Sequence, residues 1–173
     1  EVRKVFASAD NLDIKKDYLS DATIKIEKLQ YFGPLIQPNS LKVEIDYLQN
    51  VLLPVQNLKY NNVWGVAFSV GVMDIREIAA EKIRAMSSRA RYRDFYDLFL
   101  ILEKYRLNLN EIVGYIGRKE IRQPIAKANI KSNWSVIGTQ KEMEMNQIFY
   151  LRQINDKEIE ALIESLPFDA IDK

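Results

Sequence analysis

The sequence contains no cysteine and no histidine among its 173 residues. Without cysteine, the chain has no disulfide, no thiolate nucleophile and no cysteine-ligated zinc. Without histidine, it has no Ser-His-Asp triad, no histidine general base and no histidine metal ligand. Any catalysis must therefore use carboxylates, lysine, tyrosine, hydroxyl groups or a metal ion held by oxygen ligands.

Long apolar runs and a strong net charge are also missing. No run approaches the length that crosses a bilayer and no signal peptide is visible, so we expect a cytoplasmic protein without membrane contact. The net charge is +1, so any binding of nucleic acid depends on local patches. Apolar residues make up 47% of the chain and charged residues 28%, which is typical of an ordinary globular protein.

Hydrophobic alternation predicts antiparallel strands in the first part of the chain. Apolar residues alternate with charged ones over 23–31 and 41–48, and a turn with glycine and proline lies between them. The apolar, β-branched run 63–73 predicts another strand. Residues 9–17 are polar, and residues 49–62 contain proline and an Asn-Asn pair, so we expect a loop and an irregular connection there.

Helical spacing takes over after residue 73. Asp74 and Glu77 have the spacing of a capping box, and a second helix should begin near Tyr92. We therefore expect an α+β fold, in which a β-rich domain over 1–73 precedes a helical domain over 74–173. Further helical segments are expected at 1–8, after Asn108 or Asn110, at 139–152 and at 156–166.

Two charged residues are directed partly toward the core of the predicted helices. Lys82 lies at the edge of the face formed by Ala79 and Met86, and Asp94 lies on the stripe continued by Leu98. Burial of either charge without a partner would be costly, so we expect them to contact each other, a ligand or a metal ion. A lysine that reaches solvent, an aspartate that stabilises a helix start and a simple ion pair are the plainer interpretations.

The joint between these helices is strongly basic. From residue 82 to residue 93 there are five cations and no acid, namely Lys82, Arg84, Arg89, Arg91 and Arg93. Such a run is typical of a solvated face, and it would also suit a polyanionic ligand.

Glu44 and Asp46 lie two residues apart and share one face of the predicted strand 41–48. Paired carboxylates in this arrangement approach divalent metal ions and phosphate. Alternating charge on the solvent face of an antiparallel strand is the other interpretation.

A second basic segment, residues 118–131, carries five cations against Glu120 alone and lies near Tyr115 and Trp134. Basic residues beside aromatic rings would bind RNA, and a solvated helix face is the alternative. Trp64 is expected to pack in the core or at its edge.

The segment A-E-K-I-R-A-M-S-S-R-A-R-Y-R-D-F-Y-D-L-F, residues 80–99, resembles the signature of the AbiEii/AbiGii toxin family of nucleotidyltransferases. Members of that family carry a helix reading roughly A-x-K-x-x-A, then an arginine and an R-D-x-x-D-L helix. With the strand upstream, the resemblance covers roughly residues 20–105. The matching positions are Ala80, Lys82, Ala85, Arg89, Arg93, Asp94, Asp97 and Leu98.

The resemblance implies a nucleotidyltransferase-like sheet and a magnesium-dependent reaction. Lys82 would neutralise triphosphate charge, and Asp94 would orient Lys82 or assist deprotonation of the acceptor. Glu44 would complete the Mg²⁺ site or act as the base on the acceptor hydroxyl, with Asp46 as the alternative metal ligand.

The resemblance also implies substrates and partners. Arg89 and Arg93 would contact phosphates, and Asp97 would belong to the same substrate-binding helix. The expected reaction moves a nucleotidyl group from an NTP to an acceptor such as tRNA. A toxin of this type would act beside an antitoxin protein.

One element that the resemblance implies is missing. Nucleotidyltransferases of this superfamily carry a Gly-Ser or Gly-Gly turn and an Asp-x-Asp pair, which hold the nucleotide phosphates and Mg²⁺. Asp10 and Asp13 have the wrong spacing and follow no glycine turn. We therefore expect that this segment has been lost or lies elsewhere, and that residues 1–173 are inactive alone. The alternative is a non-catalytic helical module that binds RNA or a partner protein.

Overall fold

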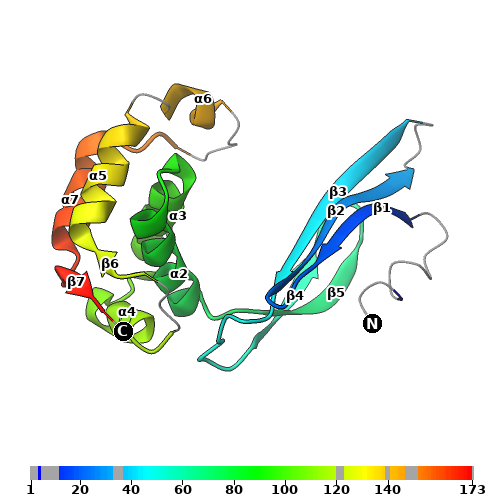
Figure 1. The fold of residues 1–173 in the computed structure, drawn as a ribbon, viewed down its shortest axis with the longest axis horizontal. Helices are drawn as coiled ribbons and strands as arrows, with labels where there is room; N and C mark the ends of the chain where they lie inside the picture. Colours follow the sequence, from blue (N-terminus) through cyan, green and yellow to red (C-terminus); the bar gives the residue numbers. More distant parts are fainter. Residues whose placement is uncertain are drawn as a thin grey trace. The chain divides into compact units, whose positions relative to one another are not determined.

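The chain forms two compact units, residues 1–50 and 51–173 (Figure 1). Their antiparallel sheets and helices confirm the α+β fold. The contacts divide the chain after Asn50, whereas the expected division after residue 73 marks the change from strands to helices. The structure, a computed structural model, describes residues 4, 12–32, 37–119, 123–138, 141–146 and 152–172. The helix expected at 1–8 lies outside the described residues, Lys4 apart.

The first unit contains a three-stranded antiparallel sheet in the order β1-β2-β3. Its strands are β1 Leu12–Leu19, β2 Thr23–Phe32 and β3 Pro38–Asp46. The predicted antiparallel pair, here β2 and β3, is confirmed. Ile26 and Leu29 are both fully buried, although they are three residues apart, because the register between β2 and β3 shifts between them.

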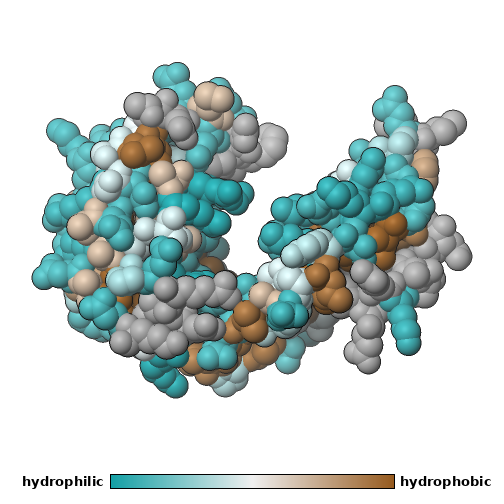
Figure 2. Space-filling model, in the orientation of Figure 1, coloured by the Kyte–Doolittle hydropathy of each residue, from teal (hydrophilic) through white to brown (hydrophobic). Residues whose placement is uncertain are grey.

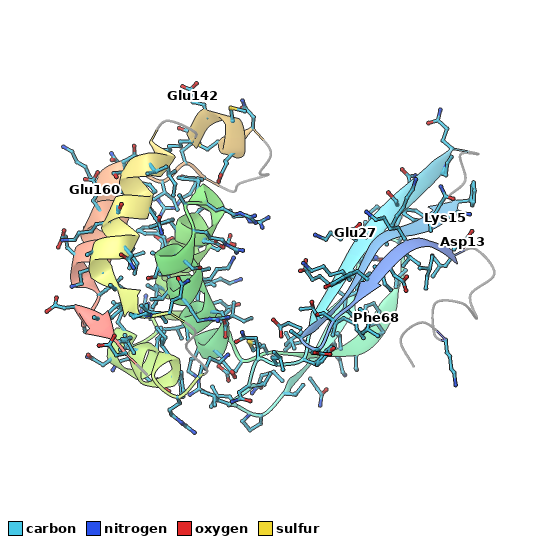
Figure 3. The ribbon with its side chains drawn as sticks, viewed as in Figure 1. Asp13, Lys15, Glu27, Phe68, Glu142 and Glu160 are labelled. Atoms are coloured by element: carbon cyan, nitrogen blue, oxygen red, sulfur yellow. The ribbon has the colours of Figure 1, made fainter. Side chains whose placement is uncertain are left out.

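Strand β1 shows that the loop expected at residues 9–17 is wrong from Leu12 onward, and residues 9–11 lie outside the described residues. Ile14 pairs with Leu29 of β2, so the ladder holds a segment whose composition is mostly polar. Four of the eight residues of this edge strand are charged, and Figure 3 labels Asp13 and Lys15 on β1 and Glu27 on β2. Such charges are typical of edge strands that resist pairing with other chains.

The second unit begins with a hairpin of β4 Gln56–Asn61 and β5 Ala67–Val72. The irregular connection expected up to residue 62 is therefore wrong from Gln56 onward, and β5 begins later than expected because residues 62–66 form the turn. The Asn62 side chain accepts hydrogen bonds from the backbone amides of Trp64 and Val66, and Gly65 has a φ of 77°. Trp64 is 83% exposed, so the prediction that it packs in the core is wrong.

Alternation along the hairpin separates its two faces. Leu58 and Tyr60 lie on the same face as their partners Val70 and Phe68, whereas Lys59 lies on the opposite, polar face. Leu58, Tyr60 and Phe68 are each about half exposed, at 55%, 45% and 52%. The hairpin therefore presents an apolar face without charge.

Six helices and a short strand pair complete the described part of the second unit. They are α2 Ile75–Ser88, α3 Tyr92–Tyr105, α4 Leu109–Ile116, β6 Ile125–Ala126, α5 Lys127–Ile137, α6 Lys141–Met145, α7 Asp156–Ser165 and β7 Ala170–Ile171. The two helices predicted after residues 74 and 92 are confirmed. The tail is not wholly helical, because β6 pairs with β7, and only α6 is described within the helix expected at 139–152. None of the described helices is long and apolar enough to cross a membrane.

The helices enclose one apolar core, and hydrophilic residues cover much of their outer face in the view of Figure 2. Asn108 caps α4 and Asn155 caps α7, the latter with a complete capping box. Fully buried side chains at the centre of the core are Ile83 and Met86 of α2, Phe95 and Leu98 of α3, Ile112 of α4, Ile130 of α5 and Ile159 of α7.

The start of α2 departs from the predicted capping box. Asp74 caps the helix by accepting from the Arg76 amide at 2.9 Å. Glu77, however, is fully buried and accepts from the backbone amides of Leu52 and Leu53 at 2.8 and 3.1 Å. The second half of the capping box is replaced by a bond to the segment that leads into β4.

A buried ion cluster joins α2 to the end of α4. The Lys119 ammonium lies 2.9 Å from Glu77 and 2.5 Å from Glu81, and its side chain is 1% exposed. The solvated-face interpretation of the segment 118–131 is therefore wrong for Lys119. Charges removed from water are stable only when paired, so this lysine depends on both glutamates.

Replacement of Lys119 with methionine is expected to lower the free energy of unfolding by about 3–5 kcal/mol, because it leaves two carboxylates near the core without their cation. Urea denaturation monitored by circular dichroism measures the change. The matched control is Lys157→Met on the exposed face of α7, which should change stability by less than about 0.5 kcal/mol. Equal stability of the two variants would contradict the assignment.

Candidate functional site

The second half of α2, the joint after it and the start of α3 bring four charged side chains together. Lys82 of α2 lies 3.2 Å from Asp94 and 2.7 Å from Asp97, both on α3. Arg89, in the joint between the helices, donates to both oxygens of Asp94, from Nε at 2.8 Å and from Nη2 at 3.3 Å. The structure thus joins Lys82 and Asp94, and shows Arg89 and Asp97 as their other partners.

Helix geometry explains this arrangement. Ala79, Ile83 and Met86 direct one face of α2 into the core, and this places Lys82 at the edge of that face. Asp94 lies in the first turn of α3, where the positive end of the helix dipole favours a carboxylate. The residue is fully buried, so its charge is compatible with the core only because the cations reach it.

The start of α3 is fixed from a distant part of the chain. Arg91, at the N-cap position, makes no side-chain capping bond. Instead, Glu144 of α6 accepts from the Tyr92 amide at 2.6 Å, and Lys141 lies 5.3 Å from the centre of the Tyr92 ring. Helix α6 therefore supplies the cap of the helix that carries Asp94.

Asp94 remains ionised in this environment. Burial opposes the charge on its carboxyl group, but the hydrogen bond from Arg89 and the charges of Arg89 and Lys82 outweigh burial and hold the pKa below its ordinary value. A carboxylate with a lowered pKa and both oxygens engaged is a weak base. It is better suited to hold cations in place than to accept a proton.

A pocket of about 330 Å³ opens beside these residues. Its wall contains three cations, Lys82, Arg84 and Arg89, against two carboxylates, Glu81 and Asp94. The remaining lining residues are Met73, Ile78, Ala85 and Ser88. Both the volume and the charge are compatible with an anionic group the size of a phosphate chain.

The sequence analysis does not identify Glu81 or Ser88 as site residues, and it names Arg84 only within the basic run 82–93. The spacing of Glu81, Arg84 and Ser88 nevertheless indicates that they share one side of α2. These three follow one another at intervals of three and four along α2, as do Lys82, Ala85 and Arg89. Two adjacent rows of one helix therefore form the wall of the pocket.

Glu44 and Asp46, the predicted metal ligands, lie on β3 of the first unit. Glu44 lies 3.0 Å from Lys25 and 3.4 Å from Lys42, and hydrogen bonds from these two lysines hold the pKa of its carboxyl group below the ordinary value. Asp46 accepts from the amide of Leu48 at 2.9 Å.

The described residues do not by themselves fit a magnesium site. Among them, no group of three or more aspartate and glutamate side chains is arranged to hold a metal ion. Glu44 is already paired with two lysines, and Mg²⁺ requires oxygen ligands in near-octahedral geometry.

The remaining predicted binding residues have different surroundings. Arg93 is exposed on α3 and is not part of the pocket wall. Trp134 packs against Phe95 and Tyr92 with ring centres 5.1 and 6.2 Å apart, and Lys131 pairs with Glu164. Arg122 and Glu120 lie outside the described residues. Of the segment predicted to bind RNA, Lys119 and Trp134 are therefore engaged in the core.

A comparison with protein families matches the chain to the family described as nucleotidyl transferase AbiEii toxin of a type IV toxin–antitoxin system. The match covers residues 2–166, so it includes residues of both units and extends well beyond residues 20–105, which carry the sequence resemblance. No curated protein and no solved structure gave a significant match.

Substitution of Asp94 with asparagine should lower stability at pH 7 by about 1–3 kcal/mol, because the hydrogen bonds to a charged acceptor are lost. Because the pKa of Asp94 is lower in the folded state, the unfolded state binds the proton more readily. The contribution of Asp94 to stability is therefore complete above about pH 4 and is lost as the pH falls through the folded-state pKa. Urea denaturation at pH 7 and pH 3 should therefore show a difference from wild type that shrinks in acid.

Asp97→Asn is the matched control for this measurement, because its side chain is 42% exposed and contacts Lys82 alone among the described ion pairs. A loss below about 1 kcal/mol is expected at pH 7. A difference between Asp94→Asn and wild type that is as large at pH 3 as at pH 7 would overturn the assigned role of Asp94.

Proposed function

Because the chain belongs to the family of AbiEii nucleotidyl transferase toxins of type IV toxin–antitoxin systems, we propose that it takes part in moving a nucleotidyl group from an NTP to an acceptor such as tRNA. In this proposal the protein acts in the cytoplasm, and an antitoxin protein opposes it. The contact of Lys82 and Arg89 with the buried Asp94, beside a pocket of matching size, carries the proposal.

Lys82 is the residue that we assign to the triphosphate. Its ammonium group lies between buried Asp94 and half-exposed Asp97, and it lines the pocket. A phosphate oxygen would replace Asp97 as a partner, while Asp94 keeps the ammonium group in place. A cation held in this way stabilises phosphate charge without reorganisation during the reaction.

Asp94 is assigned a positioning role. The sequence resemblance implies one of two roles for Asp94, orientation of Lys82 or deprotonation of the acceptor. The lowered pKa and the two engaged oxygens of Asp94 support orientation. Arg89, which shares Asp94 with Lys82, is the second phosphate-binding residue of the proposal, and exposed Arg93 would contact phosphates outside the pocket.

The residues expected to bind magnesium, an Asp-x-Asp pair, do not occur in the 173-residue sequence. The reaction class uses Mg²⁺ to neutralise phosphate charge, and the expected Asp-x-Asp pair would be its main ligand. Glu44 and Asp46 would supply only two carboxylate ligands, and Glu44 already forms ion pairs with two lysines. We therefore propose that residues 1–173 do not catalyse the transfer alone, and we assign no step to the metal.

A non-catalytic module that holds RNA is less well supported. That function would need Lys119 and Trp134 at the surface, but Lys119 is buried between Glu77 and Glu81, and Trp134 packs against Phe95. The cations beside Asp94 are instead gathered in a concave pocket.

The proposal is tested with the complete gene product, labelled NTPs, Mg²⁺ and tRNA. Label should move to the tRNA, and Lys82→Ala should lower the rate at least about a hundredfold, because a preorganised charge on the phosphates is removed. Lys157→Ala is the control and should leave the rate unchanged. No transfer from any of the four NTPs, or an unchanged rate for Lys82→Ala, would refute the proposal.

A further inference from the structure

Arg84 is the third cation in the wall of the pocket, and the family signature does not include its position. The side chain is 28% exposed, and its guanidinium group contacts Glu81 through Nε at 2.8 Å and Nη2 at 2.7 Å. It lies two residues after Lys82 and five before Arg89 on the same helix and joint. Lys82, Arg84 and Arg89 all line the pocket.

A series of contacts fixes the orientation of Arg84 from the protein interior. Glu81 binds Arg84 with Oε2 and Lys119 with Oε1, and Lys119 is almost fully buried. Lys119 also binds Glu77, whose carboxylate is held by two backbone amides. An arginine supported in this way loses less conformational freedom on binding than one on an open surface.

Arg84 retains capacity for another anion. A guanidinium group has five N–H donors, of which the Nε–H and one on Nη2 face Glu81, so three remain. Glu81 is shared with Lys119, so Arg84 does not neutralise it alone. The free donors match the oxygens of a phosphate chain, which arginine binds through two parallel hydrogen bonds.

We propose that Arg84 binds the triphosphate of the NTP together with Lys82 and Arg89, and that Glu81 and Lys119 position it. This inference rests on the proposed function. The positions from Lys82 to Arg89 span about 10 Å along α2, and the pocket of about 330 Å³ is at the small end of ligand sites. An RNA backbone would instead need cations spread along an extended groove.

The test measures binding without turnover, by calorimetric titration of the complete gene product with inorganic tripolyphosphate and with each NTP. Arg84→Gln is expected to weaken tripolyphosphate and NTP binding about tenfold or more, and Arg84→Lys less, because lysine keeps the charge but not the fork. Arg118→Gln, a matched change at an exposed residue outside the pocket, should leave affinity unchanged.

Titrations of the Lys82→Ala variant and of the wild-type protein distinguish failure of this inference from failure of the proposed function. If Lys82→Ala weakens binding and Arg84→Gln does not, the inference is wrong and the proposed function stands. If the wild-type protein binds neither tripolyphosphate nor any NTP, both fail. Titration with tRNA distinguishes the source of the phosphate: a loss of tRNA affinity in Arg84→Gln with unchanged tripolyphosphate affinity would overturn the assignment to the triphosphate. Circular dichroism spectra and melting curves confirm that each variant is folded.

Discussion

The joint between α2 and α3 depends on one buried charge, the carboxylate of Asp94. A bare carboxylate in an apolar core would cost many kcal/mol, so α3 can begin where it does only if cations reach its first turn. Lys82 comes from α2 and Arg89 from the joint, so the pairing also fixes how the two helices meet. The geometry of the joint, the position of the pocket and the orientation of Lys82 all follow from this requirement.

A second buried ion cluster includes residues of the same helix, α2, and its charges are arranged in the opposite way. Glu77 and Glu81 enclose Lys119, so that a cation is central there, whereas an anion is central at Asp94. Glu81 connects the Lys119 cluster to the pocket, because its other oxygen contacts Arg84 in the pocket wall. Buried ion pairs contribute little net stability compared with well-packed apolar groups, but they tolerate few alternative arrangements. A shift of α2 against its neighbours would separate both sets of partners and leave buried charges unpaired, which is costly.

The sequence predicted that Lys82 and Asp94 contact each other, a ligand or a metal ion, and the structure shows the first of these contacts. Lys82 and Asp94 are twelve residues apart, and their helical faces already showed that both charges point inward. Lys119 and Glu144 are different, because their partners Glu81 and Tyr92 lie 38 and 52 residues away, and no local pattern links such positions. The strands β1 and β4 were missed for the same reason: pairing with a neighbouring strand, not local composition, decides whether a polar segment becomes a strand.

The hairpin β4–β5 has a practical consequence for work with this protein. Its open apolar side, with Leu58, Tyr60 and Phe68 about half exposed, carries no like charges that would keep two molecules apart. Sulfate and other kosmotropic salts strengthen the attraction between such surfaces, and dilution weakens it. Purification and crystallisation should therefore favour low concentrations of these salts, because a net charge of +1 provides little repulsion between molecules to oppose this attraction.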